Sequence, residues 1–175
     1  MIETQRLHAS TLIGILHPQP GVSAMIEIVG LAKRATPANR YYQDVAVAAE
    51  AVLELNALGY NAFVGCNPRN TCSGFESSVP FVSDLFLDLQ PERTSIEAVD
   101  HYLTQIGMPP TVVANSGHGA HMHFRVNPAD PPRAKLIWER LCKFTGSDRV
   151  FNVNRIARVP GSVNWKTEPK WCAMI

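Results

Sequence analysis

The segment LFLDLQ at residues 85–90 carries side chains that suit a metal site at the end of a strand. Alternate side chains of an extended chain share one face, so Asp84, Phe86, Asp88 and Gln90 are expected on the same side. Neighbours two residues apart lie roughly 6–7 Å from each other and can share a metal cluster, whereas Asp84 and Asp88 are too far apart to share one ion. Because an aspartate at a strand end is as often a turn cap, this pattern alone does not establish a metal site.

The segment SGHGAHMHFRV at residues 116–126 predicts a tight turn followed by a strand. The turn residues are Ser116, Gly117, His118 and Gly119, and glycines there let the backbone approach a ligand closely. After the turn, His121, His123 and Arg125 share one strand face, a row suited to phosphate oxygens. The spacing of His118, His121 and His123 also leaves open a zinc-based hydrolase. The simplest structural reading is that these histidines have ordinary partners on a sheet surface.

A third segment, NRIARVPGSVNWK at residues 154–166, is rich in cationic side chains. Arg155 and Arg158 are three residues apart, so one helical turn would point both in the same direction. The run Val159-Pro160-Gly161 ends that turn, and Asn164 and Lys166 alternate after it. Such a set is typical of contacts to phosphate or nucleic acid.

Taken in order, these segments resemble the archaeo-eukaryotic primase superfamily, in particular the RepB-like and prim-pol domains of plasmid and phage replication proteins. The resemblance covers roughly residues 60–167. It rests on Asn67-Pro68-Arg69, Asp88-Leu89-Gln90, Ser116-Gly117, Gly119-Ala120-His121, Asn152, Arg155 to Gly161, and Asn164-Trp165-Lys166. No single motif is decisive, but four motifs in the right order are specific.

The resemblance implies an α+β fold in which an RRM-like catalytic sheet packs against a smaller N-terminal α/β lobe. It implies DNA primase or polymerase activity, that is, template-directed nucleotidyl transfer assisted by Mg²⁺ or Mn²⁺. The implied partners are nucleoside triphosphates, a single-stranded DNA template or primer-template, and a fused or associated helicase. The chain would then be one domain, 1–175, with lobes at about 1–80 and 81–175, and a fragment of a longer replication protein.

The resemblance also assigns roles to individual residues. His121 would contact the phosphates of the incoming nucleotide, and a further set would hold triphosphate or template: Arg69, Ser116, Gly117, Gly119, His123, Arg155, Arg158 and Lys166. The metal ligands would be Asp88, Gln90 and Asn152, where family members have three carboxylates. An amide oxygen can ligate a hard cation but brings no negative charge, so the metal site is weakened.

This weakened site leaves two hypotheses open. One is a weak or conditional primase-polymerase, and the other is an inactive module that binds nucleotide, single-stranded DNA or origin DNA. Asp148 can take the place of Asn152 if the family's third carboxylate falls earlier in the chain.

The periodicity of the sequence predicts which elements position these residues. Strands are expected at 25–32, 61–66, 81–89, 111–115, 120–126 and 171–175, and a loop at 33–43. Helices are expected to begin at Asp44, at a capping box of Thr94 and Glu97, and at Asp130, with the first 20 residues also partly helical. Apolar Ile137, Trp138, Leu141 and Phe144 share one face of the last helix.

Composition bounds the class of protein. With 46% hydrophobic residues the chain can bury a core, and no run approaches the length of a membrane span. The N-terminus lacks the features of a signal peptide, and four cysteines without a CxxC pair predict reduced, buried thiols in a cytoplasmic protein. The net charge of +1 hides a basic third at residues 125–170, with 10 Lys or Arg against 4 Asp or Glu, which suits a polyanionic partner.

Overall fold

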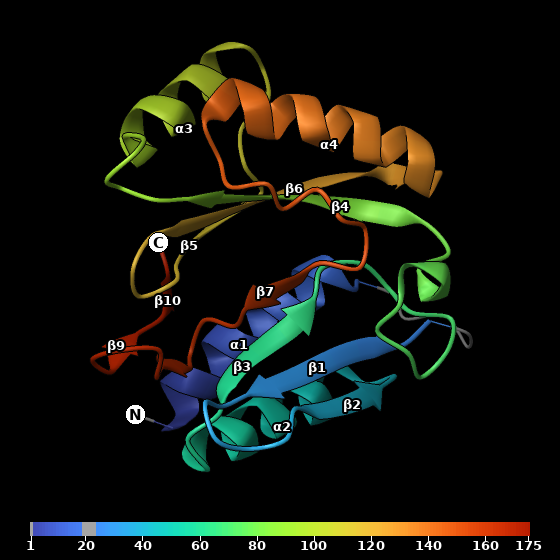
Figure 1. Cartoon of the computed structure of the whole chain (residues 1–175), viewed down its shortest axis with the longest axis vertical. Helices are drawn as coiled ribbons and strands as arrows, with labels where there is room; N and C mark the ends of the chain where they lie inside the picture. The colour runs from blue at the N-terminus through green and yellow to red at the C-terminus, as the bar shows by residue number, and fades with distance from the viewer. Residues whose placement is uncertain (1, 19–23) are drawn as a thin grey trace.

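The computed structural model describes residues 2–18 and 24–175 and shows two four-stranded antiparallel sheets with helices on their outer sides (Figure 1). The elements are α1 (Ile2–Leu16), β1 (Ile26–Leu31), β2 (Ala38–Tyr42), α2 (Val45–Ala57), β3 (Asn61–Gly65), a 3-10 turn (Glu76–Ser78), β4 (Val82–Leu89), α3 (Ile96–Gln105), β5 (Val112–Asn115), β6 (Ala120–Ala129), α4 (Pro131–Thr145), β7 (Ile156–Arg158), β8 (Val163–Asn164), β9 (Lys170–Trp171) and β10 (Ala173–Met174). The predicted α+β class is confirmed.

The first sheet has the strand order β2-β1-β3-β7 and is covered by α1 and α2. Alternation along β1 sends Ile26 and Ile28 toward the helices, where they join a core with Leu12, Val52 and Leu55. The intervening residue of β1, Glu27, is therefore on the face that looks toward the second sheet. Each fully buried aliphatic side chain of this kind contributes about 1.5–3 kcal/mol.

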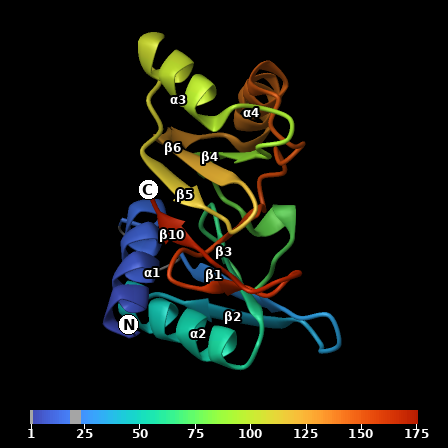
Figure 2. The ribbon, with the colours of Figure 1, turned by 90° about the vertical axis from the view of Figure 1, so that its left-hand side faces the viewer.

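The second sheet has the order β10-β5-β6-β4 and is covered by α3 and α4 (Figure 2). Leu85, Leu87 and Leu89 of β4 face these helices in a second core, in which Trp138 of α4 donates to the carbonyl of Phe86 at 2.5 Å. The other face of β4, with Asp84, Phe86 and Asp88, is turned toward the first sheet. The predicted alternation along β4 is therefore confirmed, and it places the polar residues between the two sheets.

Several boundaries differ from the prediction for local physical reasons. Residues 38–42, expected as loop, form the edge strand β2, whose half-exposed, polar residues lack the alternation of a buried strand. The cap of α3 is Ser95 rather than Thr94: the Ser95 side chain accepts from the backbone N–H of Ala98, and Thr94 belongs to the preceding turn, where its N–H donates to the carbonyl of Gln90. The caps at Asp44 and Asp130 are confirmed.

Three further expectations that involve the C-terminal part differ from the structure. Residues 155–158 were expected as a helical turn, but Ile156–Arg158 is the strand β7, held by pairing with β3. Since β7 belongs to the first sheet, the lobes are not the continuous segments 1–80 and 81–175, and the chain crosses back after α4. The predicted strand at 171–175 is split at Cys172 into the end of β9 and β10.

The structure also corrects side-chain burial. Cys66, Cys142 and Cys172 are buried free thiols, whereas Cys72 is exposed. On α4, Trp138 and Leu141 are buried, but Ile137 and Phe144 are 47% and 61% exposed. Among the described residues no helix has both the length and the hydropathy needed to cross a membrane.

Candidate active site between the two sheets

A polar cavity of about 130 Å³ opens between the two sheets, where β3 and β7 of one face β4 and β6 of the other. It is lined by Phe63, Phe86, Asp88, Gln90, Ser116, His118, His121, Arg155, Ile156, Arg158, Asn164 and Lys166. The lining residues thus come from segments that are spread over residues 63–166 of the sequence. Seven of the side chains that the sequence assigned to a site meet here: Asp88, Gln90, Ser116, His121, Arg155, Arg158 and Lys166.

Asp88 and His121 face each other across the β4–β6 pair. They are register partners, and Nε2 of His121 lies 3.8 Å from Oδ1 of Asp88. Gln90, just beyond the end of β4, donates from its amide nitrogen to the same Oδ1 at 3.0 Å. The strand therefore delivers a carboxylate, an amide and an imidazole to one end of the sheet.

The electrostatics of this group favour a cationic ligand at Asp88. Burial is the main cause that raises the pKa of Asp88, and the negative charge of Asp148 raises it further. Asp148 is held beside Asp88 by its backbone N–H, which donates to the Asp88 carbonyl at 3.0 Å. Its own carboxylate bonds to Arg93 at 2.5 Å.

His121 is a neutral imidazole in this environment. Burial lowers its pKa well below the usual range, and the charges of His123, Arg158 and Arg155 lower it further. Its Nδ1 is buried without a hydrogen-bond partner. Such a ring can hydrogen-bond a ligand through Nδ1 without adding charge to the site.

Three cationic side chains form the opposite wall. Arg158 is oriented by Phe63, whose ring lies 4.6 Å below its guanidinium, and by a hydrogen bond to Asn61 at 2.8 Å. Arg155 lies in the turn that precedes β7, which is why both arginines reach the pocket although strand alternation would separate them. Nε of Arg155 is buried and has no partner. Lys166 completes the wall.

The turn between β5 and β6 is fixed by Asn164, whose Nδ2 donates to the carbonyl of Ser116 at 2.9 Å. Asn164 also accepts from the backbone N–H of Lys166, so it holds the turn and the lysine together. A Cβ on Gly117 would lie 3.1 Å from the Asn164 side chain, and one on Gly119 would lie 2.3 Å from the carbonyl oxygen of Leu89. The two glycines thus permit close packing at the rim, as the turn motif predicts.

Arg69 is not in this pocket, although it was predicted to hold phosphate. It is fully buried and donates twice to Oε2 of Glu27, at 2.6 and 3.0 Å, and to the carbonyls of Asn67 and Asn154. With its donors engaged inside the protein, Arg69 ties the loop after β3 to β1 and to the segment before β7. Its predicted contact with a ligand is replaced by a structural role.

His123 is also outside the pocket, and the three histidines do not form a zinc site. Nδ1 of His123 lies 2.8 Å from Oδ2 of Asp84, and both side chains are fully buried. His118 is half-buried at the rim of the pocket and contacts Thr167 and Lys170. The expectation that His123 contacts phosphate is therefore wrong in this conformation, because Asp84 holds the ring away from the cavity.

Asn152 lies apart from Asp88 and Gln90. Its amide donates to Oδ1 of Asn154 at 3.0 Å, and it lines a neighbouring hollow over β1 together with Asn39 and Gly74. That hollow adjoins the first pocket, since Arg155 and Ile156 line both. The three predicted metal ligands are thus not brought together, and the carboxylate near Asp88 is Asp148.

The aromatic and aliphatic members of the wall were not assigned to a site from the sequence. Phe63 and Ile156 look like ordinary strand residues, and only the pairing of β3 with β7 shows that they border the cavity. Phe86 packs against His121 with ring centroids 4.7 Å apart. No local pattern distinguishes them from core residues.

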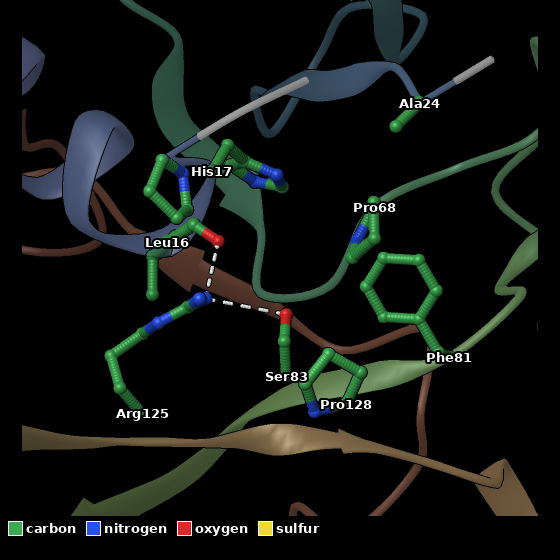
Figure 3. Close-up of a pocket in the computed structure, with 9 residues that line it drawn as sticks. Leu16, His17, Ala24, Pro68, Phe81, Ser83, Arg125 and Pro128 are labelled. Atoms are coloured by element: carbon green, nitrogen blue, oxygen red, sulfur yellow. Dashed lines mark hydrogen bonds between the residues drawn. The ribbon is translucent and has the colours of Figure 1, made fainter. Parts of the chain in front are cut away.

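A larger hollow of about 320 Å³ lies elsewhere, near the end of α1 (Figure 3). Arg125 reaches into it from β6 but bonds to the carbonyl of Leu16 and to Ser83. Apart from Arg125 and His17 its lining is mostly apolar, including Pro68, Phe81 and Pro128. It lacks the carboxylate of the smaller pocket and is not the candidate active site.

Comparisons with known proteins place the fold. A scan against protein-family models finds no match, and a search of curated proteins also finds none. Among solved structures, the chain is similar to the AEP domain of the cyanophage S-2L primase-polymerase, with a TM-score of 0.73 and 15% identity over 95% of this chain and 88% of that one.

Two further solved structures share the architecture. The catalytic domain of primase RepB′ in complex with initiator DNA matches at a TM-score of 0.69 and 15% identity, over 95% of this chain and 84% of that one. The polymerase domain of Mycobacterium tuberculosis ligase D in complex with DNA matches at a TM-score of 0.57 and 15% identity, over 99% and 79%. The chain therefore has the fold of the archaeo-eukaryotic primase-polymerase domain, as its sequence motifs predict.

Proposed function

We propose that the chain catalyses template-directed nucleotidyl transfer, as a primase or polymerase, in the pocket between its two sheets. The observation that carries the proposal is the meeting of a half-buried carboxylate, a neutral imidazole and three cationic side chains in one cavity on this fold. The carboxylate at the end of β4 and the cationic wall are both in place. The hypothesis of an inactive binding module is therefore not favoured.

The cationic wall suits the triphosphate of an incoming nucleotide. Arg155, Arg158 and Lys166 face a cavity with one lining carboxylate, so a polyanion is attracted to it. The stacked guanidinium of Arg158 is already oriented, which reduces the entropy lost when it binds phosphate.

His121 is proposed to hydrogen-bond a phosphate oxygen as a neutral donor. Its lowered pKa keeps the ring uncharged at neutral pH, and the imidazole lines the pocket beside Asp88. Phe86 packs at its edge and fixes the orientation of the ring. The residue therefore positions phosphate without competing with Asp88 for a cation.

The donor set fits a hard divalent ion, although less strongly than three carboxylates would. Asp88 and Asp148 are oxygen donors, and Gln90 adds a third once its amide turns its oxygen, in place of Nε2, toward Asp88. Burial and then the charge of Asp148 raise the pKa of Asp88, and a cation would offset both effects. Asp148 would have to leave Arg93 to take part. Bound Mg²⁺ or Mn²⁺ supplies charge neutralisation for the triphosphate and activation of the attacking 3′-hydroxyl.

The nucleic-acid partner is proposed to be a single-stranded DNA template or a primer-template. Two of the similar structures were solved with DNA, one of them described as initiator DNA. The hollow over β1 that adjoins the active pocket offers amide side chains, Asn39, Asn152 and Asn154, next to the cationic wall. A helicase partner remains a prediction of the sequence resemblance.

The test is nucleotide incorporation on a primed single-stranded DNA template with Mn²⁺. The chain is expected to extend the primer, and Asp88→Asn is expected to reduce the rate by about 100-fold or more, as loss of one preorganised electrostatic group commonly does. Asp100→Asn, on the helix that covers the opposite face of the sheet, is the matched control and should retain full activity. Extension that is unchanged in Asp88→Asn, or absent in the unaltered chain, would overturn the proposal.

A further inference from the structure

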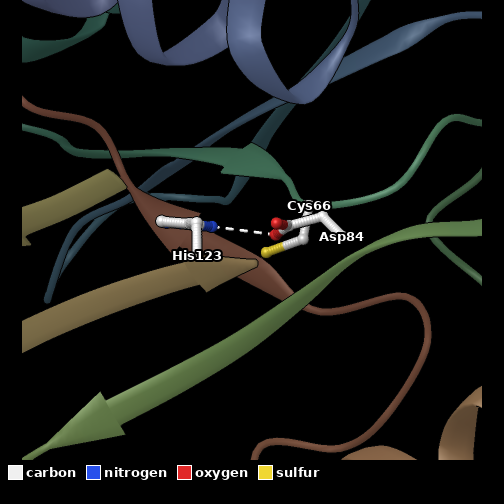
Figure 4. Close-up of side chains that lie close together, drawn as sticks. All are labelled: Cys66, Asp84 and His123. Carbon is white, nitrogen blue, oxygen red and sulfur yellow. Dashed lines mark hydrogen bonds and ion pairs between the residues drawn. The ribbon is translucent and has the colours of Figure 1, made fainter. Parts of the chain in front are cut away.

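We propose that Cys66, Asp84 and His123 form a second metal site, separate from the polymerase pocket, that takes Zn²⁺ or a similar thiolate-preferring divalent ion. The three side chains come from the end of β3, from β4 and from β6, and converge between the sheets (Figure 4). Their potential ligand atoms lie within 4.8 Å of one another. Thiolate, imidazole and carboxylate are the donors found at zinc sites in proteins.

The contacts within the cluster leave polar atoms unsatisfied. Nδ1 of His123 bonds to Oδ2 of Asp84, but Oδ1 of Asp84 and Nε2 of His123 are buried without any hydrogen-bond partner. All three residues are fully buried, so water does not provide the missing bonds from outside. Buried polar atoms are nearly always paired. An unpaired carboxylate oxygen close to a thiol therefore indicates a place where a cation would bind.

The charges of the cluster also suit a dication. With Cys66 as thiolate, Asp84 as carboxylate and His123 neutral, a divalent ion makes the whole group electrically neutral. Without an ion, His123 and Arg125 offset the burial of the Asp84 charge only in part, and burial raises the pKa of the Cys66 thiol well above its usual range. A coordinated cation reverses this preference and stabilises the thiolate. The second oxygen of Asp84 provides a fourth donor.

The position of the cluster indicates that its role is structural. The cluster joins the two sheets, since Cys66 follows β3 of the first sheet and Asp84 and His123 belong to β4 and β6 of the second. It also adjoins the polymerase pocket, because the backbone N–H of Cys66 donates to the carbonyl of Arg155 at 2.9 Å. On the other side, the ring of Phe86 lies 5.1 Å from that of His123 and 4.7 Å from that of His121. An ion here would fix the spacing of the sheets from which Arg155 and His121 reach the nucleotide.

The test is the metal content and the cobalt spectrum of the full chain, expressed without a histidine tag. Because the site is closed to solvent, the ion must be taken up during folding, so zinc or cobalt is supplied in the growth medium. We expect on the order of one ion per chain, and in the cobalt form a thiolate-to-cobalt charge-transfer band in the near ultraviolet. An oxygen-ligated ion at Asp88 gives no such band.

Substitutions of single residues show which side chain gives rise to the thiolate-to-cobalt band. Cys66→Ser is expected to abolish it, whereas Cys142→Ser, which alters a buried thiol in the core beneath α4, should keep it. Asp88→Asn should keep both band and stoichiometry, which separates this site from the polymerase pocket. Absence of the band and of stoichiometric metal in the unaltered chain would overturn the proposal even if a variant failed to fold. Persistence of the band in folded Cys66→Ser would overturn it as well.

Discussion

At the scale of single residues, burial sets the protonation state of two histidines that line different pockets. His121 is neutral in the candidate active site, and His17 is neutral after the end of α1, where its Nε2 lies 2.9 Å from the carbonyl of Gly65. Burial is the main cause that lowers the pKa of His17, to about 4. Both rings are protonated more readily in the unfolded chain than in the folded protein.

This difference predicts a loss of stability in mild acid. Between pH 6.5, where the unfolded imidazole binds a proton, and about pH 4, where folded His17 does, the unfolded state holds more protons, so stability falls as the pH falls. For His17 the loss is about 3 kcal/mol across this window. His17→Gln, which retains a donor for the Gly65 carbonyl, should flatten the profile measured by urea unfolding. Parallel profiles for the two proteins would contradict this assignment.

A second prediction at this scale concerns the donors around Asp88. Gln90→Glu adds a carboxylate beside Asp88 and should raise primer extension with Mn²⁺ by about tenfold or more, equivalent to about 1.4 kcal/mol of transition-state stabilisation. Asn152→Asp should have little effect, because Asn152 lines the neighbouring hollow and bonds to Asn154. Steady-state extension rates compare the two variants. A gain in Asn152→Asp but not in Gln90→Glu would show that the third ligand is Asn152 after all.

At the scale of elements, one buried ion pair and one tight turn hold the segments that carry the site. Arg69 after β3 and Glu27 on β1 form an ion pair with side chains 0% and 3% exposed. The turn at Gly161, after β7, packs against the backbone of α1. Each contact joins parts of the chain that are distant in sequence.

Removal of the Arg69 charge is expected to destabilise the protein strongly. Arg69→Met leaves Glu27 buried without a cation, which costs about 3–5 kcal/mol of unfolding free energy. Arg40→Met, which breaks an exposed pair with Glu54, is the matched control and should cost at most about 1 kcal/mol. Denaturant unfolding measures both. If Arg69→Met loses no more unfolding free energy than the control but binds nucleotide more weakly, Arg69 contacts the ligand phosphates, as the sequence resemblance predicts.

The turn at Gly161 gives a similar comparison. Gly161 has φ +86°, and a Cβ there would lie 2.2 Å from the carbonyl oxygen of Gln5. Gly59 has φ +82° with nothing within 4 Å of its Cβ, so Gly59→Ala costs only the strain of a left-handed backbone, about 1–2 kcal/mol. Gly161→Ala should lower the free energy of unfolding by at least about 1 kcal/mol more than Gly59→Ala does, as measured by thermal or denaturant unfolding. An equal loss of unfolding free energy in the two variants would mean that α1 shifts to accommodate the added Cβ without a measurable penalty.

The same elements show how far local sequence patterns can predict this structure. The alternation along β4, the caps at Asp44 and Asp130 and the Ser116–Gly119 turn depend on near neighbours, and the structure has them as predicted. The strand β7 and the burial of Arg69 and His123 depend on partners tens of residues away, Phe63, Glu27 and Asp84. A sequence read alone contains no local signal for those partners.

At the scale of the whole molecule, the site exists because two sheets face each other and the chain crosses between them three times, before β4, before β7 and before β10. β4 and β6 supply the carboxylate and the imidazole, and the return of the chain to the first sheet as β7 brings the arginines opposite them (Figure 1). This arrangement is shared with primase-polymerase domains at only 15–16% identity. The fold is therefore maintained by a pattern of packing and pairing that tolerates replacement of most side chains.

The measurement that tests the central claim most directly is anomalous diffraction at the manganese edge from crystals grown with Mn²⁺ and a non-hydrolysable nucleoside triphosphate. We expect a manganese peak beside the Asp88 carboxylate, with triphosphate density between that peak and Arg155, Arg158 and Lys166. Nucleotide bound in the hollow near Arg125, or no manganese at Asp88 when nucleotide is present, would contradict the assignment of this pocket as the site of nucleotidyl transfer.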